Sequence, residues 1–145
     1  MTIGREALTV MGFDYGTKRI GVAVGQTITR TASPLATIAA RNGDPRWDEI
    51  AKLVSEWSPD LFVVGLPSFS DDKAHPLHDD IQRFSRRLSG RYHHDVEFVD
   101  EYLSSIEASN DHQATKHGLD AAAARLILIT WFEQRPRRRP LNNEN

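Results

Sequence analysis

Apolar residues gather in short runs along the chain, and the spacing within each run predicts an element. Residues 8–13 are almost all apolar, which is typical of a strand buried on both faces. After a turn at residues 15–17, residues 20–25 alternate branched with small side chains, so the two segments predict a hairpin near the middle of a sheet. Residues 31–38 form a third candidate strand, which we expect near an edge because Pro34 has no N–H to donate.

A helical pattern follows in the middle of the chain. Asp44 and Pro45 suit the N-cap and the first position of a helix, and apolar residues recur at helical spacing from Trp47 to Trp57. Residues 61–66 are then continuously apolar. A run of this length directly after a helix predicts a right-handed crossover into a central parallel strand.

The rest of the chain continues the alternation of helix and strand. We predict a helix from Pro76 to a stop at Gly90, a strand at residues 96–99, a short helix opened by a capping box at 104–107, an irregular stretch at 110–119 and a final helix at 120–134. This order predicts an α/β fold in which a mixed central sheet, with an antiparallel hairpin and parallel strands, is flanked by helices. Residues 135–145 contain two prolines and four arginines, so we expect a disordered basic tail after one domain at residues 1–134.

Composition excludes several classes of function. The chain of 145 residues, of which 26% are charged, suits one soluble domain. It contains no cysteine, which excludes disulfides, thiolate catalysis and Cys-ligated zinc. No apolar run is long enough to span a bilayer and no basic-then-apolar leader opens the sequence, so we expect a cytoplasmic protein without a membrane partner. The formal net charge of -2 means that binding of a polyanion must use local patches.

Two arginine-rich segments are candidates for such a patch. Arg83, Arg86, Arg87 and Arg91 lie in one predicted helix, where they form either a phosphate-binding surface or an ordinary solvated face. The arginines of the tail either bind a polyanion or belong to a disordered segment whose charge keeps it in water. The six histidines fall mostly in or beside polar segments, which favours exposed side chains over zinc ligands.

Acidic residues end or begin several predicted elements. Asp14 directly follows the first strand, Asp100 and Glu101 follow the strand at 96–99, and Asp120 opens the last helix. Each has an ordinary structural interpretation, as a turn residue, a solvent-facing strand end or an N-cap. In an open sheet, however, ligands collect at the carboxyl ends of parallel strands. Carboxylates gathered there repel one another, so the hypothesis of a shared site requires a cation such as Mg²⁺ or Mn²⁺.

Such a site has two chemical interpretations. Two divalent ions held about 3.5–4 Å apart can activate a water and stabilise the leaving oxygen in phosphodiester cleavage. Lys18 and Arg19, beside Asp14, are then candidates to contact a phosphate. The turn at residues 14–17 also resembles the phosphate loop of the actin and sugar-kinase ATPases, but those proteins close two lobes around a nucleotide and this chain has room for one.

Five segments together resemble the YqgF/RuvX family. They are residues 13–23 (FDYGTKRIGVA), 64–67 (VGLP), 100–108 (DEYLSSIEA), 120–124 (DAAAA) and 131–134 (WFEQ). The resemblance extends from residue 8 to residue 134 and implies an RNase H-like fold. It also implies a nuclease that processes the 5′ end of pre-16S ribosomal RNA in bacteria or resolves Holliday junctions, so the expected substrate is structured RNA or branched DNA.

The resemblance also selects the residues of the site. It favours Glu101 over Asp100 as the acidic residue that follows the strand at 96–99. It thereby implies that Asp14, Glu101 and Asp120 are both the catalytic residues and the ligands of Mg²⁺ or Mn²⁺.

Three features depart from the family pattern, one of which is that the segment between Ala108 and Asp120 is shorter than expected. Tyr102 stands where the family usually has an Arg, and residues 68–72 (SFSDD) add Asp71 and Asp72 to a loop that a polyanion would approach. These departures keep open a third hypothesis, a non-catalytic nucleic-acid-binding module of the same fold. The sequence also leaves open whether the chain is a monomer or a homodimer.

Overall fold

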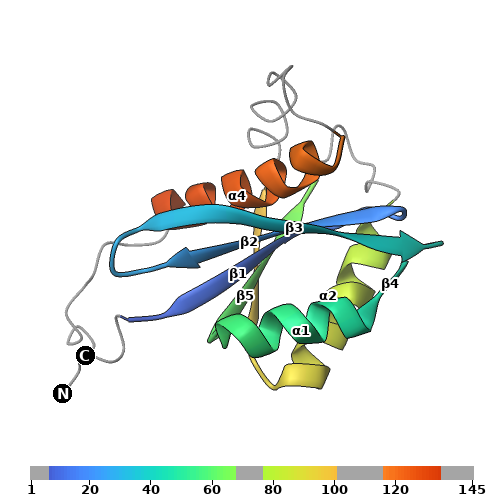
Figure 1. Cartoon of the computed structure of the whole chain (residues 1–145), viewed down its shortest axis with the longest axis horizontal. Coiled ribbons are helices and arrows are strands. Elements are labelled where there is room, and N and C mark those ends of the chain that lie inside the picture. The colour runs from blue at the N-terminus through green and yellow to red at the C-terminus, as the bar shows by residue number, and fades with distance from the viewer. Residues whose placement is uncertain (1–6, 68–76, 101–115, 135–145) are drawn as a thin grey trace.

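One mixed sheet organises the chain, with helices on both of its faces (Figure 1). The computed structural model describes residues 7–67, 77–100 and 116–134. The strands lie in the spatial order β4-β3-β2-β1-β5-β6. The elements are β1 (Thr9–Asp14), β2 (Arg19–Gln26), β3 (Thr31–Arg41), β4 (Asp44–Pro45), α1 (Trp47–Trp57), β5 (Leu61–Leu66), α2 (His78–Tyr92), β6 (Val96–Asp100) and α4 (Lys116–Gln134).

The pairing of the strands confirms the predicted mixture of antiparallel and parallel neighbours. The hairpin of β1 and β2 lies in the middle of the sheet, and β5 runs parallel to both β1 and β6. β3 pairs with β2 along its length, whereas β4 pairs only with Ala40 and Arg41 at the end of β3. Pro34 therefore sits where β3 has no outer neighbour among the described strands, which agrees with the prediction of a strand near an edge.

The continuous apolar run of β1 is explained by two hydrophobic clusters, one on each face of the sheet. Met11 and Phe13 pack towards α1 and α2, while Val10 packs towards α4. The ring of Phe13 meets the rings of Phe62 and Phe84 edge-on, with centroids 5.8 and 5.4 Å apart. β1 is thus buried on both faces, so Asp14 at its carboxyl end follows a strand that is packed on both sides.

The predicted start of the first helix, with Asp44 as N-cap and Pro45 as the first helical residue, is wrong. Asp44 and Pro45 form β4, and α1 begins at Trp47 with Arg46 as an N-cap that makes no side-chain bond. The reason is the turn before them, because Asn42 and Gly43 both adopt positive φ, at 52° and 83°. An Asn-Gly turn of this kind connects antiparallel strands, so the chain returns along β3 before it becomes helical.

The boundaries of the other two helices also differ from the prediction. α2 continues through Gly90 and ends at Tyr92. Its C-cap is His93, which adopts φ 60° and donates its N–H to the carbonyl of Ser89 at 2.8 Å. α4 begins at Lys116, so residues 116–119 are helical rather than irregular and Asp120 is not an N-cap. The predicted helix at 104–107 and the basic tail at 135–145 lie outside the described residues. Of the helices described, none is long and apolar enough to cross a membrane.

Candidate active site

Asp14 occupies the carboxyl end of the buried strand β1 and is partly exposed. Side chains alternate along a strand, and Gly12, two residues earlier, faces Leu128 and the carbonyl of Ala124 in α4. Asp14 therefore belongs to the face of the sheet that α4 covers. A carboxylate held by such a strand end has a fixed position, which favours a ligand over a solubilising charge.

Asp120 reaches the same place through the close approach of α4 to the hairpin. Gly21 lies directly opposite Asp14 in the pairing of β1 and β2, and a Cβ atom at Gly21 would overlap the carbonyl oxygen of Asp120. The backbones of strand and helix therefore touch at this point. The structure brings Asp14 and Asp120, which the sequence separates by more than a hundred residues, to one face and one end of the sheet.

An ion pair holds the Asp120 side chain. Nε of Arg19 donates to Oδ2 of Asp120 at 3.0 Å, and the two side chains are 25% and 27% exposed. Arg19 belongs to the same face of β2 as Gly21, two residues on. One carboxylate of the candidate site is thus neutralised from within the chain. The ion pair with Asp120 was not predicted from the sequence. The predicted contact of Arg19 with a phosphate stays a prediction.

The third predicted ligand cannot be placed, because Glu101 lies outside the described residues, as do Tyr102 and the loop at 68–72. Asp100, the alternative to Glu101, lies within the described residues. Val99 packs in the cluster under α4, so Asp100 belongs to the opposite face of β6 and is not on the face of Asp14. Across the described residues, no three Asp, Glu or His side chains form a group that could hold a metal ion. The ligand set therefore stays a prediction that depends on Glu101.

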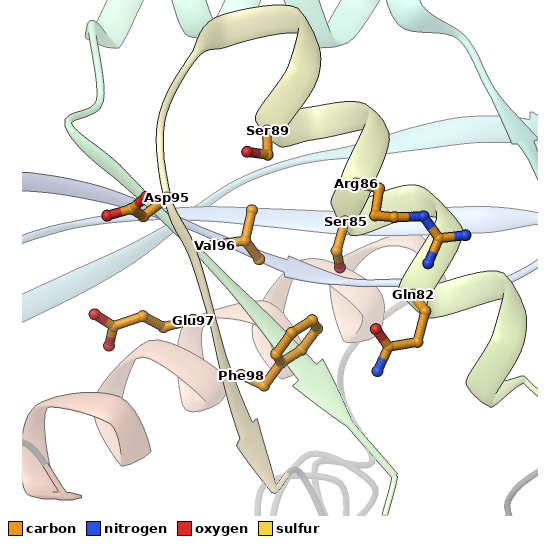
Figure 2. Close-up of a pocket in the computed structure, with 8 residues that line it drawn as sticks. All are labelled: Gln82, Ser85, Arg86, Ser89, Asp95, Val96, Glu97 and Phe98. Carbon is orange, nitrogen blue, oxygen red and sulfur yellow. The ribbon is translucent and has the colours of Figure 1, made fainter.

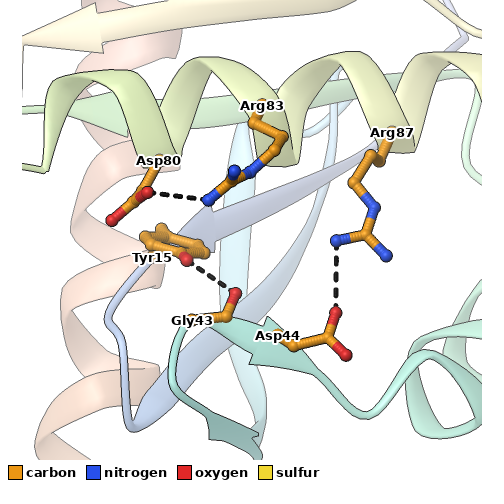
Figure 3. A network of polar contacts seen from close by, with 6 residues as sticks. All are labelled: Tyr15, Gly43, Asp44, Asp80, Arg83 and Arg87. Carbon is orange, nitrogen blue, oxygen red and sulfur yellow. Dashed lines mark hydrogen bonds and ion pairs between the residues drawn. The ribbon is translucent and has the colours of Figure 1, made fainter.

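The turn after Asp14 is fastened to the β3–β4 hairpin (Figure 3). Oη of Tyr15 donates to the carbonyl of Gly43 at 2.7 Å, and the N–H of Gly43 donates to the carbonyl of Thr17 at 2.9 Å. The N–H of Ala40 donates to the carbonyl of Lys18 at 2.9 Å. Burial raises the pKa of Tyr15, and the carboxylate of Asp80 adds to this effect. The bonds fix the backbone of the turn while the Lys18 side chain stays exposed.

Comparison with known proteins now decides the family. A model of the RuvX family, described as "Holliday junction resolvase", matches residues 8–134. The chain belongs to the RuvX family. A relative from Hydrogenovibrio crunogenus, named "Putative pre-16S rRNA nuclease", is 47% identical over 124 residues, which cover 86% of this chain and 92% of the relative. A relative of the same name from Pectobacterium carotovorum is 46% identical over 135 residues, covering 88% and 97%. The resemblance inferred from the five segments is confirmed.

Solved structures show the fold of this RuvX-family chain. RuvC of T. thermophilus in complex with a Holliday junction substrate superposes with a TM-score of 0.57 at 14% identity, covering 88% of this chain and 96% of RuvC. The fowlpox virus resolvase in complex with Holliday junction DNA gives a TM-score of 0.52 at 14% identity, covering 88% and 98%. These likenesses confirm the predicted RNase H-like fold and, at such identity, nothing finer.

Sequence reasoning missed three contacts around the candidate site of this RuvX-family chain: the Arg19–Asp120 pair, the bond of the Tyr15 hydroxyl and the close approach at Gly21. The last had a signal in the sequence. In the hairpin, Gly12, Gly21 and Gly25 all fall on one face, and glycines gathered on one face of a strand pair indicate the close approach of another backbone.

Proposed function

We propose that the chain is a metal-dependent endonuclease that processes the 5′ end of pre-16S rRNA in the cytoplasm. Relatives that are 47% and 46% identical along nearly their whole length carry pre-16S rRNA nuclease in their names, and the matching family is described as a resolvase. The observation that carries the proposal is the convergence of Asp14 and Asp120 on one face of the sheet, across the contact at Gly21.

The donors at this face suit a hard divalent cation. Asp14 and Asp120 offer carboxylate oxygens from a rigid strand and a rigid helix, and oxygen ligands are those that Mg²⁺ and Mn²⁺ prefer. In the proposal both residues hold the cation, and Glu101 is the third ligand. The bound metal would activate a water and stabilise the leaving oxygen of the phosphodiester.

The remaining residues of the site bind and orient the substrate. Lys18 is exposed on a turn whose backbone is fixed by two hydrogen bonds to the β3–β4 hairpin, so its ammonium group can meet a phosphate next to Asp14. Arg19 uses its Nε–H on Asp120 and positions that carboxylate. Lys18 is therefore the stronger candidate for the phosphate contact.

The test is cleavage of a pre-16S rRNA fragment with an extended 5′ end, measured with Mg²⁺, with Mn²⁺ and with a chelator. Asp14→Asn keeps the shape of the side chain and removes its charge, so we expect cleavage to fall by about two orders of magnitude or more because the water is no longer activated. Asp60→Asn is the matched control: Asp60 accepts the N–H of Thr9 at the opposite end of β1, 2.9 Å away, and its substitution should leave cleavage unchanged.

Equal activity of the wild type and Asp14→Asn would refute the site. A four-way DNA junction is the second substrate, because the family is described as a resolvase. Cleavage of the junction without cleavage of the RNA would show that branched DNA is the substrate, and metal-dependent phosphodiester cleavage would remain the proposed reaction. Binding of either nucleic acid without cleavage in both metals would instead support the non-catalytic module.

A further inference from the structure

A groove of about 380 Å³ lies between α2 and β6, on the face of the sheet opposite α4 (Figure 2). This volume falls in the range of ligand pockets, about 300–1,000 Å³. Its side chains are Gln82, Ser85, Arg86 and Ser89 from α2, with Val96 and Phe98 from β6. The groove is therefore mostly polar, with one aromatic ring and one cation.

The acidic residues beside the groove face away from it. Figure 2 shows the side chains of Asp95 and Glu97 on the far side of β6 from α2. Glu97 is held there, because its Oε1 accepts the N–H of the Trp131 indole at 2.7 Å. Among the residues that line the groove, Arg86 is thus the charged residue on the α2 side, while Asp100 shares the face of β6 with Phe98.

Arg86 differs from its neighbours on α2. Arg83 and Arg87 are paired, with Asp80 at 2.9 Å and with Asp44 at 3.1 Å. Arg91 lies over the ring of Trp47, 4.2 Å from its centroid. In the part of the chain that the structure describes, no carboxylate pairs with Arg86, whose guanidinium is exposed in the groove. The arginines of α2 are therefore mainly structural, and Arg86 is available for a ligand.

Phe98 is one of the large apolar residues that stay exposed in the described part of the chain. Its side chain is 38% accessible, and the ring points from β6 towards α2 in Figure 2. An exposed ring beside a cation and hydrogen-bonding side chains matches one nucleotide: the base stacks on the ring, a phosphate meets the guanidinium, and the amide and hydroxyl groups reach the base edge. Only Val96 and Phe98 are apolar here, which is too little for the core of a protein interface.

The groove lies on the opposite face of the sheet from Asp14 and Asp120, and its strand β6 is separated from β1 by β5. β1, β5 and β6 run parallel, so Asp14 and Asp100 lie at the same end of the sheet. Phe98 precedes Asp100 by two residues, about 7 Å along the strand. β6 is the last strand in the described order of the sheet and pairs with β5 on its inner side.

We propose that this groove binds one nucleotide of the single-stranded part of the RNA substrate, with the base on Phe98 and a phosphate on Arg86. The inference rests on the proposed function and adds to it a substrate contact outside the acidic site. Gln82 and Ser89 supply hydrogen bonds to the base edge, and the stacking contact accepts any base.

The experiment measures binding of a short fluorescein-labelled single-stranded RNA by fluorescence anisotropy, in an Asp14→Asn background so that the RNA stays intact. We expect Phe98→Ala and Arg86→Gln each to weaken binding about tenfold. Phe98→Tyr keeps the ring and should restore binding. Arg86→Gln should also reduce the slope of log affinity against log salt by about 0.7, the value for one phosphate contact on a single strand, whereas Phe98→Ala should not.

Two matched controls lie outside the groove. Arg83→Gln removes an arginine of the same helix that is paired with Asp80, and Ile28→Ala removes another exposed apolar residue, 68% accessible, in the turn between β2 and β3. Both should bind the RNA as the parent does. Unchanged affinity of both Phe98→Ala and Arg86→Gln would overturn the proposal.

Failure of the inference and failure of the proposed function have different signatures. If the wild type cleaves the pre-16S fragment and Phe98→Ala cleaves and binds it equally well, the groove proposal is wrong and the nuclease stands. If the groove variants lose RNA binding as expected but the wild type cleaves nothing with either metal, the groove proposal stands and the nuclease is wrong. An equal loss of affinity for duplex DNA in Phe98→Ala would refute the assignment to a single strand.

Discussion

The charge of the candidate site depends at the residue scale on the ion pair between Arg19 and Asp120. Without a metal, Arg19→Ala leaves a carboxylate only 27% exposed without its cation, and we expect a loss of about 1 kcal/mol in the free energy of unfolding. In the proposed site, Mg²⁺ takes over the neutralisation, so the loss should shrink when Mg²⁺ is added. Urea denaturation with chelator and with Mg²⁺ measures both values.

A control for this variant is Arg46→Ala. Arg46 is 57% exposed and lies 3.8 Å from its two acidic partners, so its removal should change stability by less than about 0.5 kcal/mol under both conditions. An equal loss for Arg19→Ala with and without Mg²⁺ would show that no cation reaches Asp120.

Tyr15 gives a prediction that depends on pH. Tyr15→Phe removes the 2.7 Å bond to the carbonyl of Gly43, so at neutral pH we expect a loss of about 1 kcal/mol. Burial raises the pKa of Tyr15 above 10.0, hence its neutral form stabilises the fold fully below pH 10 and this contribution is lost as the pH rises through the folded-state pKa.

The stability difference between the wild type and Tyr15→Phe should therefore narrow above pH 10. Burial also raises the pKa of Tyr92, so the stability of Tyr15→Phe will still depend on pH, but more weakly than that of the wild type. Urea denaturation of both proteins at neutral and alkaline pH measures the difference. A gap that stays constant into the alkaline range would contradict the assignment.

At the scale of elements, the packing of α4 on the hairpin depends on a position without a side chain. Gly21→Ala places a methyl group against the carbonyl of Asp120, which belongs to the backbone and cannot move alone. We expect a loss of about 2–3 kcal/mol and a fall in cleavage, because α4 must shift and carry Asp120 away from Asp14. Thermal unfolding and the cleavage assay measure the two effects.

Gly90→Ala is the opposite case within α2. A Cβ atom there would meet nothing within 4 Å, and an exposed glycine inside a helix costs stability through its backbone freedom. We expect Gly90→Ala to be about 0.5–1 kcal/mol more stable and fully active. A similar effect of both alanines would show that the contact at Gly21 does not limit the packing of α4.

At the scale of the whole molecule, the sequence predicted what depends on local pattern. Continuous apolar runs predicted β1 and β5 because a strand buried on both faces has to be apolar throughout, and the mixed sheet followed from the order of elements. Helix ends were predicted less well. The turn at Asn42 and Gly43 and the αL residue His93 decide them through single backbone conformations that apolar periodicity does not report.

The candidate site shows the same division. Asp14 and Asp120 were predicted from their places at element ends and lie on one face, although Asp120 is inside its helix and not at its cap. The bond from Arg19 to Asp120 spans 101 residues, and no local pattern links the two. Glu101 was inferred from family resemblance and lies outside the described residues, so the completeness of the acidic site stays a prediction.

Helix α4 supplies both Asp120 and most of the helical side of one hydrophobic cluster. Near its other end, the carbonyl of Phe132 accepts a bond from Nη2 of Arg30 at 2.6 Å, so the β2–β3 hairpin fastens the helix at both ends. Detachment of α4 from the sheet would expose that cluster to water and separate Asp120 from Asp14 in a single cooperative event. Loss of activity on heating should therefore coincide with melting of the fold instead of preceding it.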